Sequence, residues 1–205
     1  MNILAFDTSS ETLSIAAAQG EKILEARDFQ VETRHSEHLV LRLKELMKDM
    51  RWGWKDVSCL AVSVGPGSFT GLRVGLMTAK TAAYALNKKL VGVSSLEILA
   101  WPSANFEGEI AAVLDARKGK VYACIFQGGD RRLKILKAPF LTTIEALMKN
   151  KKKDRLFVDA PAPKFSRATF LVKAASARVA ARLFTDPFDL EPLYLHPRDC
   201  NVTRK

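Results

Sequence analysis

The sequence predicts an α/β fold built from two copies of a β-β-β-α-β-α unit. An apolar run that ends in an aspartate opens each half of the chain, at residues 2–7 (NILAFD) and 109–115 (EIAAVLD). In both halves a β-rich run follows, and Asp7 precedes Leu13 by the same distance that Asp115 precedes Val121. Self-similarity of this kind indicates an internal duplication. We therefore expect a first unit at residues 1–101 and a second, compact unit at residues 108–205.

The order of elements follows from periodicity and turn signals. In the first unit we expect strands 2–7, 12–18 and 21–28, helix 36–50, strand 58–64, helix 68–87, strand 90–93 and helix 95–101, in this order. In the second unit we expect strands 109–115, 120–127 and 131–137, helix 143–149, strand 156–159 and helix 168–184. A cleft between two such units is the default place for a ligand.

Residues 62–80 (VSVGPGSFTGLRVGLMTAK) predict a strand, a tight turn and a glycine-rich helix. Gly71 and Gly75 lie one turn apart and give this helix a narrow face of small side chains. Two interpretations remain open: a phosphate cradle at the helix N-terminus, or a helix that packs closely on another helix. The lysine that ends a Walker loop is absent after Gly67, which argues against a P-loop.

The composition is that of a globular protein, with 48% hydrophobic and 26% charged residues among 205. No apolar run approaches the roughly 18 residues that cross a membrane, and the N-terminal run is too short for a signal peptide. The three cysteines (Cys59, Cys124, Cys200) lack metal-binding spacing. We expect a cytoplasmic protein with reduced, non-catalytic thiols and no membrane association.

The net charge of +10 is distributed unevenly. Residues 1–107 carry 12 Lys and Arg against 12 Asp and Glu, whereas residues 108–205 carry 20 against 10. This asymmetry favours a polyanion near the second unit, although a solvated basic surface explains it as well. The lysines Lys151, Lys152 and Lys153, together with the run 131–134, are the candidate contacts for nucleic-acid phosphates.

A duplicated β-β-β-α-β-α unit with an aspartate after each first strand resembles the actin-like ATPase, sugar kinase and Hsp70 (ASKHA) superfamily. More specifically, the segments FDTSS, RHSEHL, GPGSFTGLRVG, VSSLE, DARKGKVYA and PLYL resemble the TsaB (YeaZ) family, and together they cover nearly the whole chain. In catalytic TsaD-like relatives, two histidines on the helix after the glycine-rich segment bind a metal. Residues 94–99 (SSLEIL) contain no histidine, and Ser and Leu are not ligands for such a site.

The resemblance implies a non-catalytic scaffold that forms a heterodimer with TsaD, and that enables threonylcarbamoyl transfer to the N6 of adenosine beside the tRNA anticodon. It also implies an ATPase partner, TsaE, contact with tRNA through the complex, and a homodimer in isolation. No intrinsic cofactor is expected, but ATP or ADP could bind at the interface of the assembled complex. Both long helices of the first unit carry apolar residues on more than one side, which predicts a helical interface with TsaD. The predicted interface residues are His35, Leu39, Leu43, Leu46, Leu72, Arg73, Leu76, Met77, Lys80 and Tyr84.

By this resemblance, Asp7 and Asp115 stand where kinase and ATPase relatives hold magnesium or a nucleophilic water, and Asp7, Thr8 and Asp115 are the candidate nucleotide-binding residues. The alternative function is therefore a small ASKHA-type kinase or ATPase that acts through the two aspartates. Ser9 replaces the glycine that kinase relatives carry after the first aspartate, which favours remnant aspartates over a working nucleotide site. His35 and His38 are only a weak indication of a metal site, because the sequence offers no firm third ligand beside them. We therefore predict no metal site. The sequence contains no Ser-His-Asp spacing and no HExxH motif that would support peptidase activity.

Overall fold

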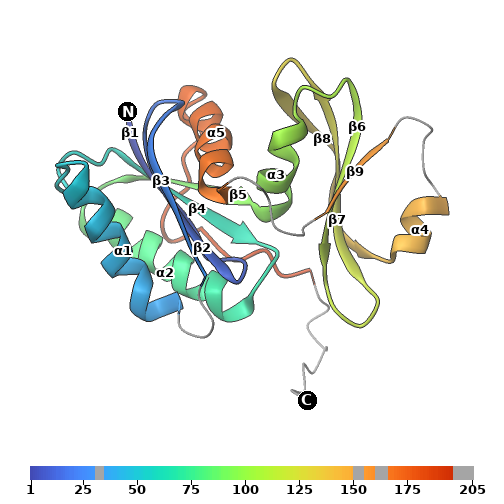
Figure 1. The fold of residues 1–205 in the computed structure, drawn as a ribbon, viewed down its shortest axis with the longest axis horizontal. Helices are drawn as coiled ribbons and strands as arrows, with labels where there is room; N and C mark the ends of the chain where they lie inside the picture. Colours follow the sequence, from blue (N-terminus) through green and yellow to red (C-terminus); the bar gives the residue numbers. More distant parts are fainter. Residues whose placement is uncertain (31–34, 150–154, 160–165, 196–205) are drawn as a thin grey trace.

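The computed structural model describes residues 1–30, 35–149, 155–159 and 166–195, and it contains two mixed β-sheets with helices between them and outside them (Figure 1). The first sheet has the order β3-β2-β1-β4-β5 and the second the order β8-β7-β6-β9. The strands of the two sheets are β1 (Asn2–Asp7), β2 (Thr12–Gln19), β3 (Lys22–Gln30), β4 (Cys59–Gly65), β5 (Lys89–Ser94), β6 (Gly108–Asp115), β7 (Val121–Gly129), β8 (Arg132–Thr142) and β9 (Leu156–Asp159). The helices are α1 (His35–Asp49), α2 (Phe69–Ala85), α3 (Ser95–Ala100), α4 (Ile144–Lys149) and α5 (Arg167–Ala180), with a 3₁₀ turn at Trp101–Ser103.

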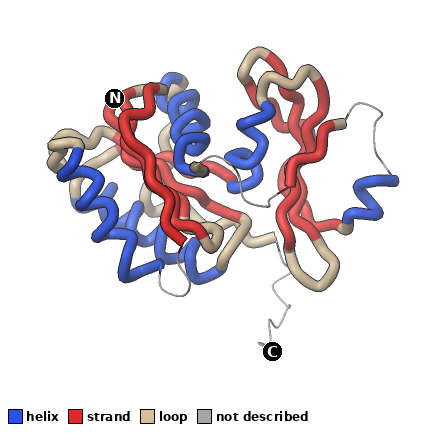
Figure 2. Tube along the Cα trace, viewed as in Figure 1, coloured by secondary structure: helices blue, strands red, loops and turns tan. Residues whose placement is uncertain are grey.

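The two sheets confirm the predicted duplication. In the first sheet β1 pairs antiparallel with β2 and parallel with β4. In the second sheet β6 pairs antiparallel with β7 and parallel with β9, in the same arrangement. Asp7 and Asp115 therefore end equivalent strands, because each is the last residue of the first strand of its repeat. This repeated arrangement agrees with the ASKHA fold that the resemblance implies, and Figure 2 shows helices beside both sheets.

Helices α1 and α2 cover one face of the first sheet (Figure 1). Their apolar stripes meet the sheet in one core that includes Leu39, Leu43, Leu72 and Leu76. On α1 the spacing of three and four residues between the leucines puts them on the same side of the helix. The stripe that the sequence shows is thus used within the chain, against the sheet.

Helix α3 lies between the two sheets and contacts both. Leu96 and Leu99 pack on the second sheet with Ile110 and Phe126. Ile98 points to the other side and joins the core beneath the first sheet. A six-residue helix with apolar side chains on two sides is expected where two layers close over it.

Helix α5 differs from our expectation. We predicted that the helix at residues 168–184 would complete the second unit, but α5 packs on the first sheet, where Leu171 and Val172 share a core with Ile3 and Ala5. Small alanines along α5, such as Ala175, let the helix lie close to the sheet. The chain after β9 therefore returns to the first sheet, while the unit boundaries themselves stay a prediction.

The segment 184–195, which we call the C-terminal strap, continues across the edge of the first sheet. The Thr185 amide donates to the Leu90 carbonyl oxygen of β5 at 2.8 Å, and the Leu193 amide donates to Val64 at 2.8 Å. Leu190 is buried in the core between α2 and the sheet. Among the described helices, none is long and apolar enough to cross a membrane.

Candidate functional site

The turn after β1 is the first candidate site, and it is closed by the protein itself. Asp7 is 0% exposed, and its carboxylate accepts a hydrogen bond from the Ser9 amide at 2.8 Å. The guanidinium of Arg167, the first residue of α5, forms an ion pair with Asp7 at 2.7 Å and also donates to the Ser9 hydroxyl at 3.2 Å. An internal cation thus occupies the place beside Asp7 that the predicted nucleotide site would need for a metal ion.

The electrostatics of Asp7 agree with this arrangement. Burial by itself raises the pKa of the carboxyl group. The positive charge of Arg167 and the hydrogen bonds from Ser9 outweigh that effect, so the pKa of Asp7 lies below its usual value. The carboxylate stays ionised at neutral pH, and its charge is already balanced within the chain.

Three glycines, in α2 and just before it, lie against this same turn. A Cβ atom at Gly67 would collide with the carbonyl oxygen of Ser9, and one at Gly71 with that of Thr8. A Cβ atom at Gly75 would collide with the Thr8 hydroxyl, which donates to the Gly71 carbonyl oxygen at 2.7 Å. The close approach that the glycine spacing indicates is real, but it brings α2 onto the turn after β1. Close packing on a second helix was one of the two open interpretations, and the structure corrects it because the turn after β1 lies against these glycines.

The N-terminus of α2 is likewise engaged from within. Ser68 caps the helix, with its hydroxyl accepting from the Gly71 amide at 3.2 Å. The Ser68 amide donates to the Ser9 carbonyl oxygen at 2.7 Å. A phosphate cradle would need free backbone N–H groups at this helix end, and these contacts already occupy two of them. This disfavours the phosphate-cradle interpretation of residues 62–80.

Asp115 stands in a different environment from Asp7. It is exposed, and its carboxylate accepts from the Arg117 amide at 2.8 Å. The equivalent turns thus differ, one buried beneath α2 and α5 and one open to solvent.

The predicted interface residues separate into two groups. The leucines are wrong as contacts for a partner that docks on the intact fold, because each is at most 2% exposed and lies in the core beneath α1 and α2; they are Leu39, Leu43, Leu46, Leu72 and Leu76. The physical reason is that both helices use their leucine stripes on the first sheet. His35 begins α1, but its side chain lies outside the described part of the structure.

The outer face of α2 remains available. Met77 is 59% and Tyr84 is 68% exposed, and Arg73 is exposed as well. Lys80 is half-buried because its ammonium group donates to the Leu190 carbonyl oxygen of the strap at 2.9 Å. We call the exposed side chains of α2 on this side, with Phe69, the α2 face.

The strap adds aromatic side chains at both ends of the α2 face. Tyr194 lies with its ring centroid 5.5 Å from that of Phe69, and Phe188 lies 5.2 Å from Tyr84. Arg73 connects the first pair, since its guanidinium lies 3.8 Å from the Phe69 ring centroid and donates to the Tyr194 hydroxyl at 3.3 Å. The interface predicted from the sequence does not include Phe69, Phe188 or Tyr194, although Tyr194 lies within the PLYL segment that carries the family resemblance.

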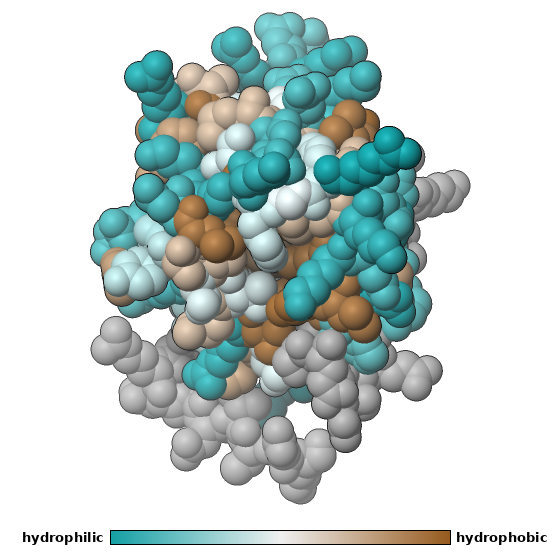
Figure 3. Space-filling model, turned by 90° about the vertical axis from the view of Figure 1, so that its left-hand side faces the viewer, coloured by the Kyte–Doolittle hydropathy of each residue, from teal (hydrophilic) through white to brown (hydrophobic). Residues whose placement is uncertain are grey.

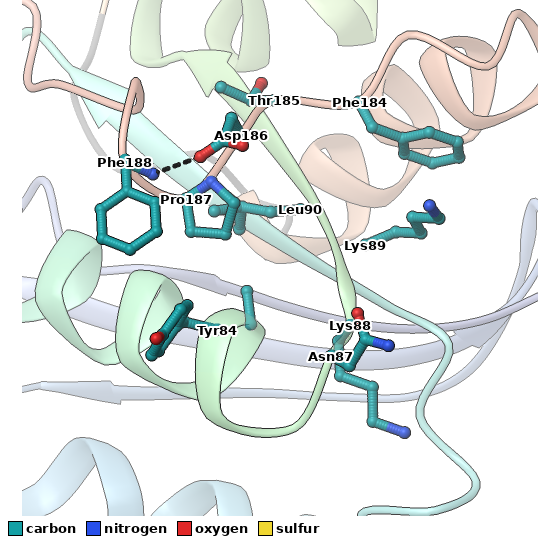
Figure 4. Close-up of a pocket in the computed structure, with 11 residues that line it drawn as sticks. Tyr84, Asn87, Lys88, Lys89, Leu90, Phe184, Thr185, Asp186, Pro187 and Phe188 are labelled. Atoms are coloured by element: carbon teal, nitrogen blue, oxygen red, sulfur yellow. Dashed lines mark hydrogen bonds between the residues drawn. The ribbon is translucent and has the colours of Figure 1, made fainter.

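A cleft of about 480 Å³ opens where the strap passes the C-terminal end of α2. Figure 4 shows Phe188 and Tyr84 at one side of this cleft, Pro187 of the strap next to Phe188, and Lys89 directed toward Phe184. The Asp186 carboxylate accepts from the Phe188 amide at 2.7 Å and fixes the turn of the strap.

The surface on the side of α1 is mixed in polarity. Figure 3 views this side and shows hydrophobic patches in its middle and lower part between polar side chains. Val40 and Leu41 of α1 are among the exposed apolar residues, at 43% and 50%. They lie off the leucine stripe, as the sequence predicts.

Two further predictions lie outside these surfaces. Lys151, Lys152 and Lys153 are outside the described residues. Within the described ranges no group of three or more His, Cys, Asp or Glu side chains could hold a metal ion.

Comparison with known proteins identifies relatives. The family model of tRNA N6-adenosine threonylcarbamoyltransferase, TsaD, matches residues 30–184. The tRNA threonylcarbamoyladenosine biosynthesis protein TsaB of Bacillus subtilis is 38% identical over 127 residues, which are 62% of this chain and 56% of that protein. The TsaB protein of Escherichia coli is 30% identical over 129 residues, 62% of this chain and 55% of that one. The chain thus matches little more than half the length of these curated relatives.

Solved structures show the same fold. A Pseudomonas aeruginosa protein with similarity to peptidase YEAZ superposes with a TM-score of 0.81 at 22% identity, covering 95% of this chain and 99% of that one. YeaZ from the same organism superposes with a TM-score of 0.79 over the same shares of both chains. The chain therefore resembles the TsaB and YeaZ proteins in sequence and in fold.

Proposed function

The chain belongs to the family of the tRNA N6-adenosine threonylcarbamoyltransferase TsaD, and from this premise we propose that it is a non-catalytic subunit that docks on a catalytic TsaD and enables its activity on tRNA. Its similarity to TsaB proteins, which are named for tRNA threonylcarbamoyladenosine biosynthesis, supports the pathway. The non-catalytic role and the partner are our inference from the residues described above.

The observation that carries the proposal is the ion pair between Asp7 and Arg167. A kinase or ATPase of this fold needs the carboxylate after the first strand to face a metal ion and phosphate groups. Here a guanidinium contacts that carboxylate, and the side chains of both residues are at most 7% exposed. Opening the site would leave both charges buried without a partner, which costs several kcal/mol. This argues against the alternative function through Asp7 and Asp115.

Docking is supported by the composition of the α2 face. Aromatic residues, methionine and arginine are enriched in protein interfaces and supply most hot spots. The α2 face presents Phe69, Arg73, Met77 and Tyr84 on one rigid helix, and the strap extends it with Phe188 and Tyr194. Helix α2 spans about 25 Å at 1.5 Å per residue, which suits a facing helix of a partner. A second copy of this chain would use the same face when TsaD is absent.

Reconstitution tests the proposal. We expect threonylcarbamoylated tRNA to form only when this chain is added to TsaD, the ATPase TsaE and the adenylate-forming enzyme, with any ATP or ADP bound at the junction of the assembled complex. The Asp115→Asn variant tests the non-catalytic role, because this side chain is exposed and asparagine keeps an oxygen that can accept the Arg117 amide, so a scaffold should keep its enabling effect. Nucleotide turnover by the isolated chain, lost in Asp115→Asn, would instead establish the kinase or ATPase function.

A further inference from the structure

The duplication gives the chain two equivalent turns, and only the first is covered. The turn after β1 is buried, with Asp7, Thr8 and Ser9 each at most 5% exposed. The connection between β6 and β7, residues 116–120, is exposed at Arg117, Lys118 and Lys120. We call this connection the basic tip. No other described element supplies an acidic ion-pair partner to these three side chains.

The backbone of the basic tip is tightly held. Arg117, Lys118 and Gly119 have positive φ angles of 65°, 52° and 71°, a conformation that costs non-glycine residues energy. The Ala116 amide donates to the Lys120 carbonyl oxygen at 2.9 Å, and the Lys120 amide donates to Arg117 at 3.0 Å. The Asp115 carboxylate accepts the Arg117 amide at 2.8 Å, so this acid is engaged by the loop backbone. The tip therefore presents three cations from a preorganised loop.

From this placement we propose that the basic tip binds phosphate groups of the tRNA backbone. The inference rests on the proposed function, which brings tRNA to the complex, and adds a contact surface on this chain. It agrees with the charge distribution, since the whole excess of +10 lies in residues 108–205. Three neighbouring exposed cations on a protruding loop can contact successive phosphates of an extended polyanion, and their binding is driven by counterion release.

The chemistry favours RNA phosphates over a free nucleotide. A small ligand is normally held in a concave site that buries most of its surface. Arg117, Lys118 and Lys120 are exposed at the end of a hairpin, which offers charge without enclosing walls. The contact should be independent of base sequence, because lysine and arginine at phosphates position a nucleic acid without reading it.

The experiment compares two variants that remove the same charge. In the tip variant Arg117, Lys118 and Lys120 are changed to Gln. In the control variant Lys22, Lys48 and Lys55, which are exposed on the first unit, are changed to Gln. The affinity for the tRNA substrate is measured by fluorescence anisotropy over a series of salt concentrations, with the full chain alone and with TsaD.

Each lost phosphate contact lowers the slope of log K against log salt by about 0.7 to 0.9. We expect the tip variant to lose ~2 to 3 units of slope and the control variant to keep the wild-type slope. An equal loss of slope in both variants, or no loss in the tip variant, would overturn the inference. A tip variant that loses ATP binding but keeps the slope for tRNA would overturn it as well. Single changes Lys118→Gln and Lys120→Gln, each expected to remove one contact, replace the tip variant if it fails to fold.

The outcome separates this inference from the proposed function. If the chain fails to support tRNA modification in the reconstitution, the proposed function is wrong whatever the slopes are. If modification is supported and the slopes do not change, the subunit role stands and the basic tip is a solvated loop.

Discussion

Changing Asp7 to Asn should destabilise the fold strongly, because it leaves the Arg167 guanidinium buried without a counter-charge. Asp7 is 0% exposed and the Arg167 side chain is 7% exposed, so water cannot compensate for the missing charge. Breaking one partner of a buried ion pair costs about 3 to 5 kcal/mol. With a urea m value of about 2 kcal/mol/M, the midpoint of unfolding should fall by ~1.5 to 2.5 M.

Urea unfolding followed by circular dichroism measures this change, and Asp49→Asn is the matched control. Asp49 forms an ion pair with Arg27 at 2.8 Å, but its side chain is 57% exposed. An exposed pair contributes about 0 to 1 kcal/mol, so the control should shift the midpoint by less than ~0.5 M. A loss below about 1 kcal/mol in Asp7→Asn would refute the reasoning that this pair holds α5 to the turn after β1.

The same carboxylate gives the protein a dependence on acid pH. The pKa of Asp7 in the folded chain is lower than its ordinary value of 3.8, so the folded state binds this proton less readily than the unfolded state. The stabilisation is therefore complete above the unfolded pKa, and it is lost as the pH falls below 3.8 and through the folded pKa. Wild type should lose stability across this window more steeply than Asp7→Asn, and parallel curves would contradict the assignment.

Three other changes test the remaining assignments. Gly71→Ala should cost about 1 to 3 kcal/mol in urea unfolding, because its methyl group would collide with a carbonyl oxygen of the turn after β1; unchanged stability would contradict the close approach. Met77→Glu should abolish co-purification with TsaD and leave the unfolding midpoint unchanged, whereas Leu76→Ala should cost about 2 to 5 kcal/mol because its side chain is 2% exposed. Burial raises the pKa of both the Cys59 and the Cys124 thiol to about 12, so in a Cys200→Ser variant a thiol reagent at pH 8 should label the chain only after unfolding.

Much of the fold could be predicted because hydrophobic periodicity and turn chemistry are local signals. The aspartate-terminated strands, the capped glycine-rich helix and the repeated strand order all follow from neighbouring residues, and the sheets confirm them. The destination of α5 was predicted wrongly. Its alanine-rich apolar stripe fits either sheet, and nothing in the local sequence states which one it contacts.

The candidate site was predictable only in part. Arg73, Met77 and Tyr84 were predicted as interface residues, and they are exposed on α2 because they lie off its leucine stripe. The leucines themselves were misassigned, since an apolar stripe looks the same whether it meets a sheet of its own chain or a helix of another.

The sequence by itself determined that the chain is a duplicated α/β fold with an aspartate at the end of each first strand, because the spacing of residues within a strand or a helix decides those features. Tertiary structure alone decided that Arg167, 160 residues from Asp7, neutralises the first aspartate while the second stays exposed. It also decided that the strap returns to α2. Contacts between residues far apart in the chain depend on how whole elements pack, and packing is a property of the assembled layers that no local pattern records.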